Sequence, residues 1–74
     1  MKTKVEIFPS GWIGLSLSLK AEEIDVLISR LQYLKSKSDG HFHFHGADHS
    51  GTPGIADIEI SFSPPEEADD MKIG

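Results

Sequence analysis

The sequence predicts a two-layer α+β fold in the order ββαββ, with a four-stranded, mainly antiparallel sheet packed against one helix. Apolar and polar residues alternate in four short segments, which is the period of strands with one buried face. Between the second and third segments, apolar residues recur every three or four positions, which is the period of a helix. Glycine, proline and serine separate the segments and favour turns.

The first two segments predict a hairpin. Residues 4–8 alternate, Pro9-Ser10-Gly11 favours a turn, and residues 12–20 alternate more strictly. One face of the hairpin is therefore apolar and the other is polar. The side chains that we expect to face the helix are Val5, Ile7, Leu15 and Leu17.

The predicted helix covers residues 21–36. Its apolar stripe consists of Ile24, Leu27, Ile28, Leu31 and Leu34. Acidic residues lie in the first turns and lysines near the end, an order that suits the helix dipole. Ser38-Asp39-Gly40 then ends the helix.

Two further strands follow the helix. Residues 41–45 read His-Phe-His-Phe-His, and residues 46–54 are too rich in glycine for a regular element. In the fourth strand, Asp57, Glu59 and Ser61 alternate with Ile58, Ile60 and Phe62. The helix-facing side of these two strands is expected to consist of Phe42, Phe44, Ile58, Ile60 and Phe62. We expect one domain over residues 1–62 and a flexible acidic tail over residues 63–74.

Composition limits the possible functions. A chain of 74 residues fits one domain, and the absence of cysteine excludes disulfides and thiolate metal sites. The formal net charge of −5 disfavours binding to nucleic acid, whose affinity depends on basic side chains. Neither a signal peptide nor a membrane span of about 20 apolar residues is present, so we expect a cytoplasmic protein with no membrane partner.

The alternate histidines support three interpretations: a metal site, a polar strand face, and a binding face that histidine protonation next to the acids would alter near neutral pH. Side chains at i and i+2 of a strand share one face, so two imidazoles could bind one metal ion such as zinc. The candidate ligands are His41, His43, His45 and His49, with Asp48, Asp57 or Glu59 as a possible carboxylate ligand. The simpler interpretation is a polar strand face on which His43 and His45 pair with Asp57 and Glu59 without a metal or other cofactor.

The same polar face is a candidate binding surface for a protein. Trp12 and Ser16 lie on its expected side in the second strand, and large aromatic residues are enriched at interface centres. The expected partner-binding residues are Trp12, Ser16, His43, Asp57 and Glu59. Asp48-His49-Ser50 has the residue types of a hydrolytic triad, but adjacent side chains seldom align for catalysis. We therefore expect no enzymatic activity.

The element order and the segment Gly40-His41-Phe42-His43-Phe44, followed by a glycine-containing loop and Ile58-Glu59-Ile60, resemble the immunity protein 32 family. These are small bacterial α+β proteins associated with polymorphic toxin systems. The resemblance covers most of residues 4–62 and implies a non-enzymatic protein that neutralises a cognate toxin by binding it. His45 and the long loop do not match the family pattern, so no binding residue is transferred.

Three functions therefore remain open. The first is a cytosolic protein-binding module, with an immunity protein as its most specific form. The second is a small metal-binding protein that uses the histidine-rich strand. The third is a homo-oligomer whose sheets pair through an exposed edge or face.

Overall fold

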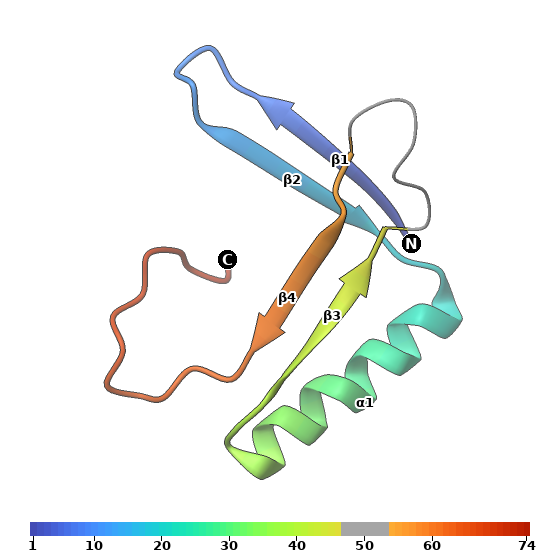
Figure 1. Cartoon of the computed structure of the whole chain (residues 1–74), viewed down its shortest axis with the longest axis vertical. Coiled ribbons are helices and arrows are strands. Elements are labelled where there is room, and N and C mark those ends of the chain that lie inside the picture. The colour runs from blue at the N-terminus through green and yellow to red at the C-terminus, as the bar shows by residue number, and fades with distance from the viewer. Residues whose placement is uncertain (47–53) are drawn as a thin grey trace.

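The computed structural model describes residues 1–46 and 54–74 and has the α+β composition predicted from the sequence (Figure 1). Within the described residues, four strands and one helix follow the order ββαββ. They are β1 (Lys2–Ile7), β2 (Ile13–Ser18), α1 (Ala21–Lys37), β3 (His41–His45) and β4 (Asp57–Ser61). Most of the expected glycine-rich loop, including Asp48, His49 and Ser50, lies outside the described residues. Residues 62–74 contain neither a helix nor a strand.

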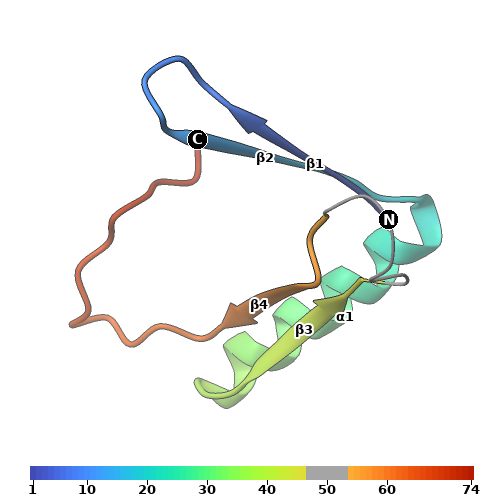
Figure 2. The same ribbon diagram turned by 45° about the horizontal axis from the view of Figure 1, so that its top comes forward.

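The strands form two separate antiparallel pairs rather than the expected four-stranded sheet. β1 pairs with β2, and β3 pairs with β4, with no ladder between the pairs among the described residues. The hairpin meets the rest of the molecule near the N-terminus, and its turn points away (Figures 1 and 2). The width of the helix gives a physical reason for the separation of the two strand pairs. A helix is about 10–12 Å wide, so it covers roughly two strands spaced about 4.8 Å apart.

The turn of the hairpin explains why β1 ends earlier than expected. The Phe8 N–H donates to the Trp12 carbonyl over 2.8 Å, and the Gly11 N–H donates to the Phe8 carbonyl over 2.9 Å. Gly11 has a φ of +86°, which glycine adopts without steric cost. The Phe8 ring lies against Gly14, where an added Cβ would be only 2.9 Å from Phe8 Cζ. Phe8 is therefore a turn residue that packs on the glycine of β2.

Capping interactions define both ends of α1. Glu23 Oε1 accepts a hydrogen bond from the Lys20 N–H over 2.9 Å, and Glu23 Oε2 lies 2.5 Å from the Met1 amino group. The Met1 amino group and then the Lys20 N–H lower the pKa of Glu23, because both favour its carboxylate. At the other end, Ser38 adopts φ +54° and its N–H donates to the Leu34 carbonyl. The predicted helix end at residues 38–40 is thus confirmed.

The core lies between α1 and the β3–β4 pair. Leu34 and Phe42 are 6% and 8% exposed, and they are the buried hydrophobic residues of the described chain. Phe44, Ile58 and Ile60 are half-buried around them. α1 runs alongside β3 in both views (Figures 1 and 2). The helix therefore stabilises the histidine-rich strand by packing on its phenylalanine face.

Removing the Phe42 ring tests this assignment of the core. Phe42→Ala should lower the free energy of unfolding by about 3–5 kcal/mol, because it removes a buried aromatic ring and leaves a cavity. Tyr33→Ala, at an exposed position of α1, should change it by less than about 0.5 kcal/mol. Urea unfolding followed by circular dichroism measures both. Equal losses in the two variants would contradict this core.

The capping role of Glu23 predicts a pH dependence. A lowered pKa in the folded state contributes stability above the pKa of the unfolded chain, and this contribution is lost as the pH falls through the folded-state pKa. Glu23→Gln should therefore be less stable than the wild type at pH 7 and equal to it near pH 2. Glu22→Gln removes a charge from the same helical turn and serves as the control. Thermal unfolding of both variants between pH 2 and pH 7 measures this difference. The same pH dependence of stability in both variants would contradict the capping role of Glu23.

Candidate functional site

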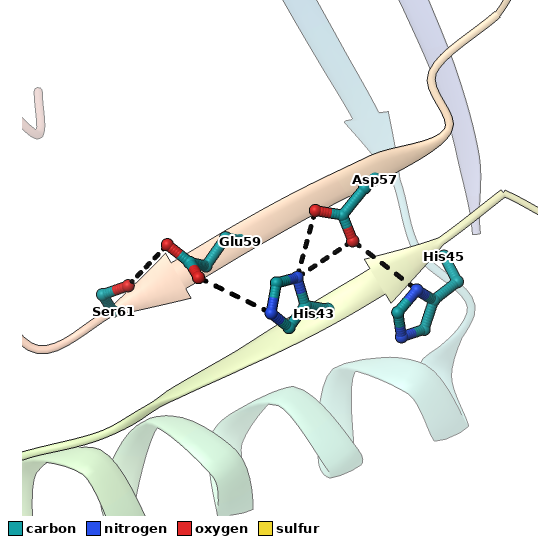
Figure 3. Close-up of polar contacts among 5 residues, drawn as sticks. All are labelled: His43, His45, Asp57, Glu59 and Ser61. Carbon is teal, nitrogen blue, oxygen red and sulfur yellow. Dashed lines mark hydrogen bonds and ion pairs between the residues drawn. The ribbon is translucent and has the colours of Figure 1, made fainter.

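Polar side chains of β3 and β4 interact across the strand pair (Figure 3). His43 Nδ1 lies 2.9 and 3.0 Å from the two oxygens of Asp57, and His45 Nδ1 lies 3.5 Å from Asp57 Oδ1. His43 Nε2 lies 3.5 Å from Glu59 Oε1. The structure therefore places His43 and His45 beside the acidic residues of β4, as the polar-face interpretation predicts.

The strand register brings these groups together. β3 and β4 pair Phe42 with Ile60, so His43 lies directly opposite Glu59 and His45 opposite Asp57. The short contact from His43 to Asp57 is therefore a diagonal one, within the reach of long side chains in an antiparallel pair. Asp57 thus contacts two histidines, and His43 lies between two carboxylates.

Hydrogen bonding defines the roles of the atoms around His43. A carboxylate only accepts hydrogen bonds, so Nδ1 of His43 must carry the proton that it donates to Asp57. In the neutral ring this leaves a lone pair on Nε2, directed toward the Glu59 carboxylate. The Ser61 hydroxyl donates to the other Glu59 oxygen, Oε2, over 3.1 Å. His43 Nε2 and Glu59 Oε1 are therefore two acceptor atoms that lie 3.5 Å apart, an arrangement suited to a bound cation.

His41 completes a group of three possible metal ligands. One ligand atom from each of His41, His43 and Glu59 lies within 4.8 Å of the others. The rings of His41 and His43 meet edge to face at a centroid distance of 5.2 Å. His45 stacks on the other side of His43 at 5.6 Å and does not belong to this group. His49, the remaining histidine of the expected metal set, lies outside the described residues.

The expected protein-binding residues do not form one surface. Trp12 directly precedes β2, and Ser16 lies within it, whereas His43, Asp57 and Glu59 belong to the other strand pair. Trp12 is 79% exposed near the turn that points away from the rest of the molecule (Figure 1). Because the four strands do not form one sheet, the aromatic residue and the histidine–acid cluster are separate features.

Sequence reasoning missed the exposed apolar face of the hairpin. Thr3 pairs with Leu17, Val5 with Leu15, and Ile7 with Ile13, so these side chains share one side. We call Val5, Ile7, Ile13, Leu15 and Leu17 the hairpin apolar face. All five side chains are exposed, and Ile7 reaches 73%. The expectation that this face packs on the helix is therefore wrong for the chain as described.

The helix exposes part of its own apolar stripe. Leu34 is buried and Leu27 is half-buried, but Ile24, Ile28 and Leu31 remain exposed. A cavity of about 290 Å³ lies where the start of α1, the chain start and β3 meet. Its apolar lining includes Met1, Leu19, Val26, Leu27, Phe42 and Phe44. The hollow therefore provides a recess for an apolar side chain beside the exposed helix surface.

The total surface shows how open the chain is. It exposes 6774 Å², whereas the scaling for compact monomers gives about 4,500 Å² for a mass of 8.1 kDa. Its radius of gyration is 14.5 Å, against about 11 Å for a compact domain of 74 residues. Part of the excess belongs to residues 62–74, which run without regular structure, and the exposed apolar faces add to it. Such faces are typical of a surface that binds another protein.

Comparisons with family models, with curated proteins and with solved structures find no match to this chain. The resemblance to the immunity protein 32 family therefore stays a prediction from the residues that carry it. No helix among the described residues has the length and apolar character needed to cross a membrane.

Coupling between the two strands of the polar cluster can be measured by a double-mutant cycle. Replacing His43 with Ala and Asp57 with Asn, singly and together, should give a coupling of about 0.2–1 kcal/mol, since both groups are partly exposed. The pair His41 and Asp57, which lie four residues apart in the same register, is the control and should give almost none. Urea unfolding measures both cycles. No coupling in the first cycle would show that the His43–Asp57 contact contributes nothing to stability.

Proposed function

We propose that this chain is a non-enzymatic protein-binding module whose partner covers the hairpin apolar face. The observation that carries the proposal is that all five side chains of this face are exposed, although they sit in a regular antiparallel pair. A two-stranded pair alone is only marginally stable in water, and packing against another element stabilises it. Within the described chain α1 covers β3–β4 instead, so a partner would supply the missing layer.

The size of the exposed surface supports this proposal. Standard protein interfaces bury about 800 Å² on each partner. The difference between the exposed area and that of a compact monomer of this mass is roughly 2,300 Å². Even a fraction of that difference suffices for a standard interface. The cavity beside α1 would accept one apolar anchor from the partner, since such pockets commonly hold the residues that dominate binding.

Charge favours a basic protein as the partner. The chain carries twelve acidic and seven basic residues, and its formal net charge is −5. Complementary charge speeds association and excludes acidic competitors. The resemblance to the immunity protein 32 family implies a toxin as the partner, and a toxin with a basic surface would meet both requirements. We therefore propose neutralisation of a cognate toxin by direct binding as the specific form of this function.

The single four-stranded sheet remains part of this proposal as a feature of the bound state. Both strands of each pair have a free edge among the described residues, and the link between β2 and α1 is only Leu19–Lys20. Rotation at this link would bring the hairpin beside β3–β4. A partner that covers the combined apolar side would stabilise the closed arrangement.

A matched pair of substitutions in β2 tests the binding face. Leu15→Asp places a charge on the hairpin apolar face, and Ser16→Asp places the same charge on the opposite side of the same strand. If the gene next to this one encodes a toxin-like protein, that purified protein is the ligand, and calorimetry measures its affinity. Leu15→Asp should weaken binding at least 30-fold, the equivalent of about 2 kcal/mol at a central contact. Ser16→Asp should change it less than about threefold.

Two outcomes would overturn the proposal. The first is equal affinity of the two variants, because the partner would then not bind the hairpin apolar face. The second is a dimer of the isolated wild type in sedimentation that Leu15→Asp dissociates, because a second copy of the chain would then cover that face. Circular dichroism of each variant verifies that it folds. If no complex forms with such a neighbouring gene product, the specific proposal of toxin neutralisation fails.

A further inference from the structure

We infer that His41, His43 and Glu59 form a binding site for a divalent transition-metal ion, with zinc as the best match. The site lies on the polar side of β3–β4 and is independent of the hairpin apolar face. Two imidazoles and one carboxylate are the donor set that zinc accepts in sites with an open coordination position. The ligands come from adjacent strands in a defined register, which fixes their spacing.

The distance from His43 to Glu59 fits a shared ion. Zinc–nitrogen and zinc–oxygen bonds of about 2.0–2.2 Å in a tetrahedron separate two ligand atoms by roughly 3.3–3.6 Å. His43 Nε2 and Glu59 Oε1 lie 3.5 Å apart, within that range. With Nδ1 of His43 donating to Asp57, the neutral ring has its lone pair on Nε2. A cation between these atoms would replace the repulsion of two acceptors with two bonds.

His41 is the third ligand. Its ring projects from the same face as His43, two residues earlier in β3, and its ligand atom lies within 4.8 Å of the other two. Coordination requires an approach of at most about 1.5 Å, which side-chain rotation of an exposed histidine supplies. A water molecule would occupy the fourth position of a tetrahedron.

Neighbouring residues already orient the ligands as metal sites require. A histidine that binds zinc commonly donates its other ring N–H to a carboxylate, which fixes the tautomer and raises the basicity of the ligand nitrogen. Asp57 accepts this hydrogen bond from His43, and Ser61 holds the second oxygen of Glu59. His43 and Glu59 are therefore both positioned by partners that lie outside the coordination sphere.

Titration of the untagged full-length chain with Zn²⁺ tests the site. Isothermal titration calorimetry should show saturable binding of one ion, and Co²⁺ should give the visible absorption of a four-coordinate ion. His43→Ala and His41→Ala should each weaken Zn²⁺ binding at least tenfold. Asp57→Asn should weaken it by about 10–100-fold through the orientation of His43. Circular dichroism verifies the fold of each variant.

His45→Ala is the matched control, because His45 lies on the same face of the same strand but outside the ligand group. Its Zn²⁺ affinity should stay within about threefold of the wild type. Two results would overturn the inference: no saturable Zn²⁺ binding by the wild type, or an equal loss in His45→Ala and His43→Ala. The second would indicate non-specific binding along the histidine row. Neither result bears on the partner that we propose for the hairpin.

Discussion

The one helix of the described chain can cover about two strands, and β3 and β4 occupy that position. Leu34 and Phe42 are the buried hydrophobic residues among those described, and the other features follow from their burial. The phenylalanines of β3 face the helix, so its histidines must face the other way, beside the acids of β4. No second helix among the described residues covers the hairpin, so its apolar side remains exposed.

The two surfaces proposed to be functional therefore have different origins. The histidine–acid cluster exists because β3–β4 is packed, paired and in register, which places His43 between Asp57 and Glu59. The hairpin apolar face exists because β1–β2 is paired but not packed. The first surface offers a defined set of donor atoms suited to an ion. The second offers area without a fixed polar pattern, which suits a protein.

Local sequence patterns account for much of this fold. The alternation of apolar and polar residues predicted four strands, and the segment 41–45 matches β3 at both ends. The recurrence of apolar residues every three or four positions predicted α1 to within one residue of its end. Alternation also shows which side chains share a face, but it does not show what covers that face. Val5 and Leu15 occupy apolar positions in the alternating pattern, which predicts that they are buried. They are exposed, and the width of a single helix is the physical reason. Phe8 lies outside β1, and its ring packs on Gly14. The alternation of apolar and polar residues does not indicate this contact.

The candidate site was predictable in part for the same reason. The rows of histidines and acids were expected to meet once β3 and β4 paired, and the structure places them so. The sequence does not define the register of β3 and β4. That register places His43 diagonally across from Asp57 and brings Glu59, rather than Asp57, into the ligand group with His41. The expectation that Trp12 shares a surface with them depends on a four-stranded sheet, which the described chain does not form.

The central claim is that a single helix leaves the hairpin uncovered in the free chain. Solvent paramagnetic relaxation of methyl groups, measured by NMR on a sample shown to be monomeric, tests it most directly. The methyl groups of Val5, Ile7 and Leu15 should relax strongly with a soluble gadolinium probe, while those of Leu34 should be protected. Hairpin methyl groups as protected as those of Leu34 would contradict the account, because they would place the hairpin apolar face inside the core.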